Sequence, residues 1–255
     1  MNVFPVPDVP EVAQGDDLAA TIDDRVDLQS DDVVCVASTV VSKTEGRFAN
    51  LDEYPAGPRA REIAAHLESI TGDEKDPRFA QAVLEESTEV LMQAPFLLTE
   101  TRFGHIGVNA GIDRSNVPEH DLLLLPKRPS ESAARIRAGL TNRPAVIVTD
   151  TSGRPFRHGQ RGVAIGWAGM SASRDWRGET DRENHELQAT VESVVDELAA
   201  AHNLVAGEGA GGRPVTVVRD WQFGDIAGSD NLFRNVSTDF VRQALRAWEY
   251  EAREG

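Results

Sequence analysis

The spacing of hydrophobic residues changes from segment to segment along the chain, which predicts both strands and helices. Continuous apolar runs predict buried strands at 32–38 and 145–149, because a strand covered on both faces needs no alternation. Further strands are predicted at 163–167 and 215–218, and a hairpin at 96–109. Apolar residues at helical spacing predict helices within 60–67, 79–91, 131–140 and 240–248, and a helix with an apolar stripe at 187–198 that ends near Gly207. The irregular order of these elements favours an α+β fold of irregular mixed sheets and helices over a barrel or a doubly wound sheet.

Polar residues gather where several of these segments end. The first two strands lead into polar turns, which contain Lys43 in one case and Asp150 and Thr151 in the other. A third polar cluster, residues 109–116, contains Asp113 among small residues. Strands that end in this way often deliver side chains to a site at their carboxyl edge. These clusters are therefore the first candidates for chemistry.

The length of 255 residues allows one large domain or two small ones. Residues 47–77 form the most polar and turn-rich region outside the termini. This region is either a surface excursion or a boundary between two lobes. We interpret residues 1–255 as a single two-lobed unit, in which residues 219–255 form a helical C-terminal tail.

The charge of the chain excludes some classes of partner. There are 42 acidic and 26 basic residues, which give a formal net charge of −16, so nucleic acids and anionic membrane surfaces are repelled at long range. The acidic, lysine-poor composition is typical of a protein in a high-salt cytoplasm, where screening weakens self-repulsion. Cys35 is the only cysteine, so no intramolecular disulfide forms. With no secretory signal and no apolar run near ~18 residues, we expect a soluble cytoplasmic protein.

The acidic side chains of the polar clusters suit a divalent cation. Mg²⁺ commonly takes one or two protein carboxylates together with nucleotide phosphates and water. Asp113 and Asp150 can supply the carboxylates, Thr151 a hydroxyl, and Asn116 a contact to the nucleotide. The alternative is that both aspartates only form turns, because Asp-Arg-Ser-Asn and Asp-Thr-Ser-Gly are common turn sequences.

Two further features could bind phosphate. Lys43 is one of only three lysines, and its ammonium could reach a phosphate as a point charge; the alternative is a solvated lysine in a turn. Residues 207–212 are rich in glycine, which lets backbone N–H groups approach a phosphate closely. This stretch lacks the P-loop pattern, so a flexible loop is the alternative.

Several of these segments together resemble one known family. They read ASTVVSKTEGR at 37–47, NAGIDRSN at 109–116, TDTSGRPFR at 149–157 and DWRG at 175–178, and residues 204–219 fit as well. In this order they resemble the gamma-glutamyl ligase family of coenzyme F420 biosynthesis. The resemblance extends from about Val3 to Val218, and the composition suggests a member from a halophilic archaeon.

The resemblance implies a GTP-dependent ligase that adds L-glutamate by gamma-linked amide bonds to the deazaflavin precursor F420-0 through an acyl phosphate. It also implies a two-lobed monomer that forms an intertwined homodimer. The alternatives are a phosphotransferase that binds Mg·GTP and a nucleotide-responsive regulatory module, neither of which forms an amide.

The resemblance also implies which residues act. One divalent ion, Mg²⁺ or Mn²⁺, is expected at Asp113 and Asp150, a second at Thr151 and Glu208, and K⁺ is expected as well. Catalytic roles fall on Lys43, Asp113 and Asp150. The expected GTP contacts are Val9, Pro10, Glu11, Val12, Ser38, Thr39, Lys43, Asn116, Ala206, Gly207, Glu208, Gly209, Ala210, Gly211 and Gly212. One departure is Asp8, which stands where the family predicts a glycine.

Overall fold

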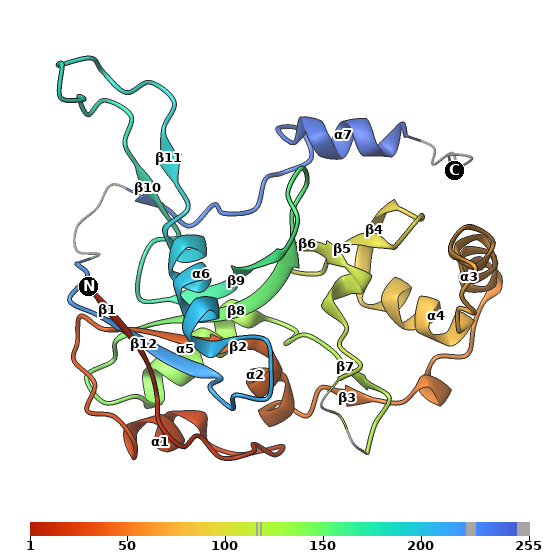
Figure 1. The fold of residues 1–255 in the computed structure, drawn as a ribbon, viewed down its shortest axis with the longest axis horizontal. Coiled ribbons are helices and arrows are strands. Elements are labelled where there is room, and N and C mark those ends of the chain that lie inside the picture. Colours follow the sequence, from red (N-terminus) through yellow and green to blue (C-terminus); the bar gives the residue numbers. More distant parts are fainter. Residues whose placement is uncertain (116, 118, 223–227, 249–255) are drawn as a thin grey trace. The chain divides into compact units, whose positions relative to one another are not determined.

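The computed structural model describes residues 1–115, 117, 119–222 and 228–248, and the chain divides into two compact units (Figure 1). Unit 1 consists of Met1–Gly46 and Arg128–Leu232, and unit 2 consists of Arg47–Lys127 and Phe233–Gly255. Helices and several small mixed sheets occur together, which confirms the predicted α+β class. None of the described helices is both long and apolar enough to cross a membrane.

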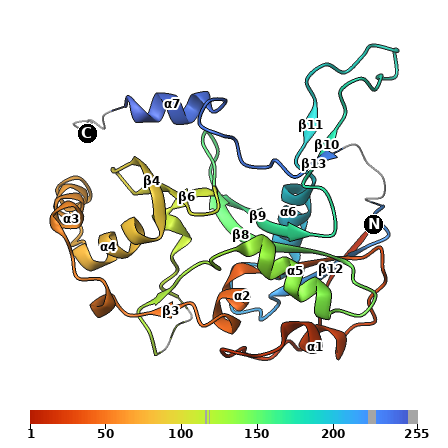
Figure 2. The same cartoon turned by 180° about the vertical axis from the view of Figure 1, so that it is seen from behind.

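Unit 1 is built on a five-stranded sheet in the order β1-β12-β2-β8-β9. Its strands are β1 (Asn2–Pro5), β12 (Val215–Arg219), β2 (Val33–Ala37), β8 (Ala145–Gly153) and β9 (Gln160–Ala168). Only β2 and β8 pair in parallel. Helix α6 (Val194–Ala206) covers one face of the sheet and α5 (Pro129–Gly139) covers the other (Figures 1 and 2). The central strands are therefore buried on both sides, as their continuous apolar runs predict.

A β-bulge in β9 lets this strand contact both helices. The register with β8 shifts between Val148 and Thr149, so that one extra residue is accommodated in β9. A Cβ atom at Gly162 would lie 2.2 Å from the carbonyl oxygen of Ala199 in α6. One at Gly166 would lie 2.3 Å from the backbone of α5. The bulge thus turns two glycines of one strand toward opposite faces of the sheet.

The remaining elements of unit 1 are shorter. They are α1 (Leu18–Asp23), α2 (Ser38–Thr44), β10 (Ser173–Asp175), β11 (Val191–Glu192) and β13 (Gly228–Ser229). Between β10 and β11 the chain forms a long exposed arm (Figure 1). Leu187 lies in this arm and Val191 at its end, so the prediction that both belong to the helix after them is wrong; α6 begins only at Val194.

Unit 2 contains two packed helices and a small sheet. Helices α3 (Pro58–Thr71) and α4 (Pro77–Glu85) each begin with proline at the first helical position, where the missing N–H costs nothing. Gly72, with a φ of 74°, ends α3 in the left-handed conformation that glycine adopts freely. The other elements are β3 (Phe48–Ala49), η1 (Leu51–Glu53), β4 (Ser87–Met92), β5 (Leu98–Thr101), β6 (Ile106–Val108), η2 (Asn109–Gly111), β7 (Leu122–Leu123) and α7 (Phe240–Arg246).

Two sequence predictions for unit 2 have different outcomes. The hairpin around Gly104 is confirmed, since β5 and β6 pair antiparallel on either side of it. The helix predicted through Val90 and Leu91 is wrong, because α4 ends at Glu85 and these residues lie in β4. Within the predicted C-terminal tail, the described elements are β13 and α7, and Arg242 of α7 binds the carboxylates of Glu89 and Glu100 in β4 and β5.

Candidate active site

The direction of the strands brings several predicted segments to one edge of the sheet in unit 1. Because β1, β2 and β8 run in the same direction and β12 runs opposite to them, three strands end and one begins at this edge. The backbone N–H of Val6 donates to Val215 (2.9 Å), and that of Ala37 donates to Pro214 (2.8 Å). The segments that leave or enter the sheet here are 7–12, 38–43, 150–151 and 206–214.

Ser38 and Asp150 meet at this edge. Ala37, the last residue of β2, is opposite Thr149 of β8, so the next residues of both strands are neighbours. The hydroxyl of Ser38 donates to Oδ1 of Asp150 at 3.2 Å. Ser38 is buried and Asp150 is half-buried, which leaves part of the Asp150 carboxylate accessible. The fold thus brings together two oxygen-bearing side chains that are 112 positions apart in the sequence.

Glu208 is held beside Thr151 at the same edge. The Thr151 hydroxyl donates to Oε1 of Glu208 at 3.0 Å, and Nδ2 of Asn203 donates to the same oxygen at 2.5 Å. The glycine-rich stretch brings Glu208 here because Gly207 ends α6 with a φ of 72°. Asn203 was not predicted as a site residue, and no pattern in the sequence marks it.

Lys43 lies in a helix and not in the predicted polar turn. Residues 38–44 form α2, with Val40 and Val41 packed inward, so the turn prediction for Ser42 and Lys43 is wrong. The Lys43 side chain is 10% exposed, and its ammonium forms an ion pair with Glu11, whose side chain is 84% exposed. A buried ammonium needs an anionic partner because its desolvation is unfavourable. Lys43 is therefore a buried cation paired with a carboxylate that remains in contact with solvent.

The N-terminal segment at this edge contains a left-handed residue. Asp8 has a φ of 50°, which is uncommon for a residue with a side chain and is easily adopted by glycine. This explains why the family predicts glycine at this position. The Arg25 side chain donates to the carbonyl oxygen of Asp8 at 2.9 Å and holds the turn in place.

Asp113 belongs to unit 2, whereas Asp150 belongs to unit 1. The Asp113 carboxylate accepts hydrogen bonds from the backbone N–H and the hydroxyl of Ser115, at 2.7 and 2.8 Å. Its backbone pairs with Leu123 in an isolated bridge. These contacts are those of a turn former, and the joint use of Asp113 and Asp150 stays a prediction. Asn116 lies outside the described residues.

The oxygen atoms at the unit 1 edge suit a hard cation. Asp150 and Glu208 supply carboxylates, and Ser38 and Thr151 supply hydroxyls. Among the described residues, no group of three or more His, Cys, Asp or Glu side chains has an arrangement that could hold a metal ion. Mg²⁺ and Mn²⁺ need no such group when phosphate and water complete the coordination, so the chemistry of this donor set fits the expected ions.

Other polar residues of unit 1 lie elsewhere. Arg154, Arg157 and Arg161 lie at the tip of the β8–β9 hairpin. His202 of α6 is buried, with its Nδ1 at 3.0 Å from the Thr216 hydroxyl. Burial lowers the pKa of His202 to about 4, partly offset by the charge of Glu208, so the imidazole is neutral at physiological pH.

Comparison with known proteins shows which family the chain resembles. The model of the F420-0:Gamma-glutamyl ligase family matches residues 8–220. A protein of Halorubrum lacusprofundi named "Coenzyme F420:L-glutamate ligase" is 68% identical over 251 residues, which cover 98% of this chain and 100% of the relative. A protein of the same name from Archaeoglobus fulgidus is 45% identical over 250 residues, covering 96% and 98% of the two chains. The chain belongs to the F420-0:gamma-glutamyl ligase family.

Proposed function

We propose that the protein is a GTP-dependent ligase that adds L-glutamate, through gamma-linked amide bonds, to the deazaflavin precursor F420-0. The observation that carries this proposal is the convergence of residues 7–12, 38–43, 150–151 and 206–214 at one edge of the unit 1 sheet. Family membership and the names of the relatives support the ligase activity in this proposal.

The proposed reaction has two steps. The terminal carboxylate of F420-0 attacks the γ-phosphorus of GTP, which forms an acyl phosphate and releases GDP. The amine of glutamate then attacks the acyl carbon, and phosphate leaves as the amide forms. Neither step needs a redox reagent. The contribution of the protein is to position the reactants and to neutralise charge.

Lys43 is suited to neutralising the triphosphate. Its ammonium is buried and already pairs with an anion, Glu11. Because the Glu11 side chain is largely exposed, it can return to water at little cost when a phosphate oxygen takes its place. Segment 9–12 and Lys43 would then serve the nucleotide together.

Divalent ions, Mg²⁺ or Mn²⁺, would be held by Asp150, Thr151 and Glu208 in unit 1 and by Asp113 in unit 2. When bound, they supply positive charge that offsets the repulsion between the triphosphate and the attacking carboxylate. The hydroxyl of Ser38 holds the Asp150 carboxylate in position through its hydrogen bond. We include K⁺, an intertwined homodimer and a cytoplasmic location in the same proposal.

Mass spectrometry of the deazaflavin tests the proposed reaction. Incubation of the protein with F420-0, GTP, Mg²⁺ or Mn²⁺ and L-glutamate should add the mass of one or more glutamyl units. Asp150→Asn should lower turnover by about 100-fold or more, because a neutral amide binds a divalent ion weakly. Asp31→Asn, at an exposed position just before β2, is the matched control and should retain wild-type turnover.

Three results would contradict the proposal. An unchanged mass with the wild-type protein argues against any ligase. A phosphorylated product formed without glutamate indicates a phosphotransferase. Wild-type turnover in Asp150→Asn would refute the proposed role of this carboxylate.

A further inference from the structure

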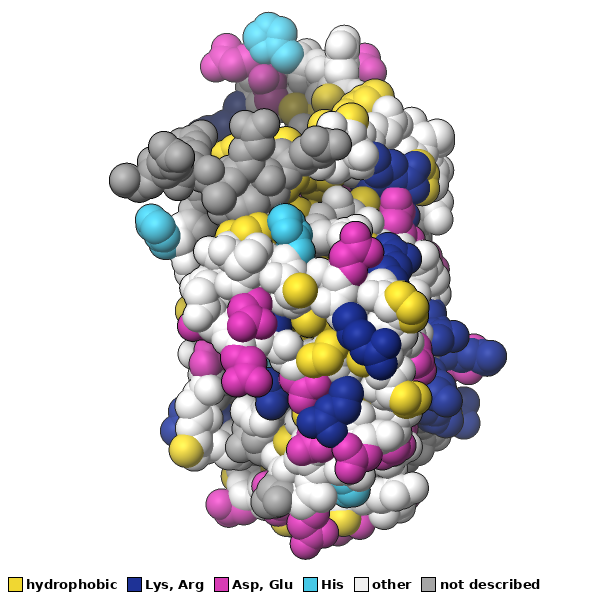
Figure 3. All heavy atoms as spheres, turned by 90° about the vertical axis from the view of Figure 1, so that its right-hand side faces the viewer, with side chains coloured by type: hydrophobic (Ala, Val, Ile, Leu, Met, Phe, Trp, Pro, Cys, Tyr) yellow, Lys and Arg dark blue, Asp and Glu magenta, His cyan; other side chains and the backbone are white. Residues whose placement is uncertain are grey.

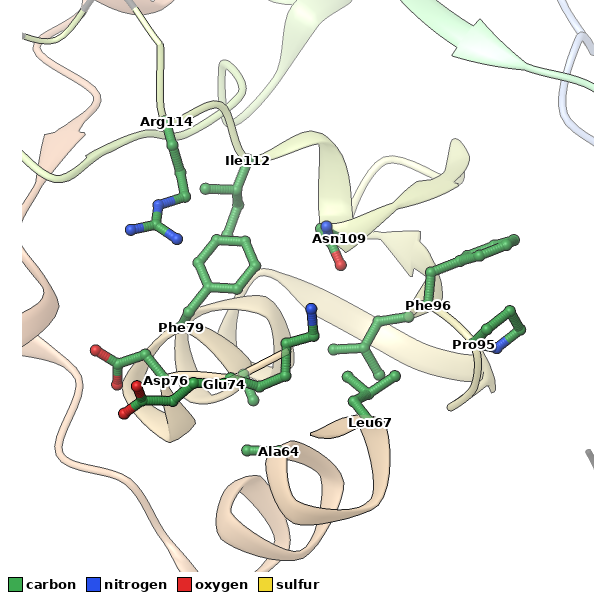
Figure 4. A pocket seen from close by; sticks show the side chains of 13 residues that line it. Ala64, Leu67, Glu74, Asp76, Phe79, Pro95, Phe96, Asn109, Ile112 and Arg114 are labelled. Carbon is green, nitrogen blue, oxygen red and sulfur yellow. The ribbon is translucent and has the colours of Figure 1, made fainter. Parts of the chain in front are cut away.

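Unit 2 contains a pocket that none of the predicted site residues explains. It has a volume of about 430 Å³ and is bounded by α3, α4 and the segments around β5 and η2 (Figure 4). This volume lies in the range of pockets that bind small organic molecules, roughly 300–1,000 Å³. Its walls are largely apolar and include Leu67, Phe79, Phe96 and Ile112.

A few polar groups interrupt the apolar walls. The side chains of Lys75, Asn109 and Arg114 line the pocket. The guanidinium of Arg114 lies 5.5 Å from the centre of the Phe79 ring, a cation–π contact. Within the described part of the chain, no hydrogen bond is formed by the side chain of Asn109, so its amide donor and acceptor are both available. Apolar walls with a few placed polar groups are typical of ligand sites.

The turn that presents Asn109 is held in an unfavourable conformation. Asn109, Ala110 and Gly111 all have positive φ, at 53°, 56° and 67°. Such a conformation costs an alanine about 1–2 kcal/mol, and strained residues of this kind concentrate at functional sites. The Thr99 hydroxyl accepts from the N–H of Ala110 at 3.0 Å, and Leu125 packs so closely on Gly111 that a Cβ there would lie 2.4 Å away.

The segment after this turn, residues 112–114, has one face toward the pocket and one face away from it. Ile112 and Arg114 line the pocket, whereas Asp113, the residue between them, does not. Neighbouring residues of an extended segment point to opposite faces. One short segment thus carries pocket residues on one side and the predicted metal ligand on the other.

We propose that this pocket binds the deazaflavin ring of the precursor, an assignment that rests on the proposed function. A flat conjugated ring can stack on Phe79 and Phe96, and the Arg114 guanidinium can contribute a cation–π interaction. The pyrimidinedione edge of a deazaflavin presents adjacent N–H and C=O groups, which match the acceptor and donor of the Asn109 amide. The Lys75 ammonium can donate to a ring oxygen.

The other substrates fit this pocket less well. L-Glutamate is too small and too polar to cover the apolar walls. A triphosphate would meet the carboxylates of Glu74 and Asp76, which also line the pocket. The base of GTP is flat and has an amide edge, so guanosine is the competitor that the experiment has to include.

Binding of the ring fragment alone tests the assignment. The probe is the deazaflavin ring with its ribityl chain but without phosphate or carboxylate, added to the full-length protein without GTP or metal. Binding is measured by the change in ring fluorescence. We expect Asn109→Gly and Phe96→Ser each to weaken binding by roughly tenfold. In the ligase assay the same variants should raise KM for F420-0 and leave kcat nearly unchanged.

Both variants have matched controls. Asn109→Gly relieves backbone strain, so the fold is retained, and its control is Asn184→Gly, at another asparagine with positive φ. Phe96 is 41% exposed, and its control is Phe156→Ser, at a fully exposed phenylalanine in the β8–β9 hairpin. Neither control should change binding of the ring or KM.

The outcomes separate this inference from the proposed function. The pocket assignment is overturned if the ring fragment does not bind, if the pocket variants bind it as the wild type does, or if guanosine displaces it. If the protein forms the amide but the pocket variants keep the wild-type KM for F420-0, the pocket assignment is overturned. The proposed ligase function is then retained. A protein that binds the ring in the expected way but forms no amide supports the pocket, and the ligase fails.

Discussion

At the scale of single residues, two buried polar side chains of unit 1, Lys43 and His202, have different partners. The partner of Lys43 is exposed to solvent, and the partner of His202 is buried. Lys43 reaches solvent through the exposed carboxylate of Glu11. His202 is 4% exposed, and its Nδ1 lies 3.0 Å from the hydroxyl of Thr216 in β12. The protonated form of His202 is therefore strongly disfavoured in the folded protein, which makes stability depend on pH.

The free energy of unfolding should fall as the pH falls from about 6.5 to about 4. The pKa of His202 is lowered from 6.5 to about 4 in the folded state, so the unfolded chain binds the proton more readily in this range. The contribution of the neutral imidazole to the free energy of unfolding is fully present above pH 6.5 and is lost as the pH falls to about 4. Its size is about 3 kcal/mol. Urea unfolding at several pH values measures it.

His202→Gln should reduce the dependence of the free energy of unfolding on pH between 4 and 6.5, because glutamine has no proton to gain. His66→Gln is the matched control, since His66 is exposed on α3, and its slope should equal that of the wild type. Asp175, whose pKa is lowered to about 2 by hydrogen bonds from Arg177, titrates below this range. Equal slopes for the wild type and His202→Gln would refute the assignment.

The site residues show what sequence can predict at this scale. Residue type and strand position placed Asp150, Thr151 and Lys43 near a strand end, and the structure brings all three to one edge. Their partners could not be predicted from the residues alone. Glu11 meets Lys43 across 32 positions and Asn203 meets Glu208 across a helix end, because these contacts depend on strand order and loop path and not on local pattern.

At the scale of secondary structure elements, the β8–β9 hairpin is the centre of unit 1. The bulge in β9 leaves the N–H of Ala164 facing α6, where the Asp196 carboxylate accepts it at 2.9 Å. Close by, Gly162 allows the strand to contact the backbone of the same helix. The hydrogen bond and the missing side chain together fix how α6 lies on the sheet.

Gly162→Ala should be strongly destabilising. The added Cβ would lie 2.2 Å from the carbonyl oxygen of Ala199, and backbone atoms cannot move away as a flexible side chain can. We expect a loss of about 3 kcal/mol in the free energy of unfolding, measured by urea denaturation. Gly153→Ala in the same hairpin is the control, because no atom lies within 4 Å of its added Cβ. Similar losses in both variants would contradict this reading of the packing.

The elements that were predicted wrongly have different physical causes. Residues 38–44 contain serine, threonine and valine, whose weak helix propensity hides α2, and the packing of Val40 and Val41 helps to stabilise this helix. Leu187 and Val191 have helical spacing but lie in or beside an exposed arm. The pocket of unit 2 has no signal in the sequence, because its walls come from α3, α4 and the segments around β5 and η2, which are separated along the chain.

At the scale of the whole molecule, the net charge of −16 dominates electrostatics. Figure 3 shows acidic and basic side chains interspersed on one face, with no large patch of a single sign. Local ion pairs therefore coexist with a long-range excess of negative charge. Salt screens the long-range repulsion first, because the Debye length falls from about 10 Å at 0.1 M to about 3 Å at 1 M.

The unfolding temperature should rise between 0.1 and 2 M KCl. Thermal unfolding followed by circular dichroism measures the rise. In a variant that removes two exposed acidic groups, Asp31→Asn with Glu68→Gln, the unfolding temperature should rise less with KCl than in the wild type. In Arg59→Gln, which removes an exposed positive charge, the unfolding temperature should rise more than in the wild type. A fall of the unfolding temperature with KCl would show that local ion pairs outweigh net repulsion.

The pair formed by Glu11 and Lys43 has a consequence for turnover in the proposed reaction. A nucleotide that arrives at Lys43 exchanges one anion for another, so the ammonium keeps a counter-charge through the whole cycle. When GDP departs, the carboxylate can swing back and compete for the vacated position. The N-terminal segment would thereby speed the release of GDP. Shortening the segment between β1 and Glu11 would slow that release and keep GDP bound for longer.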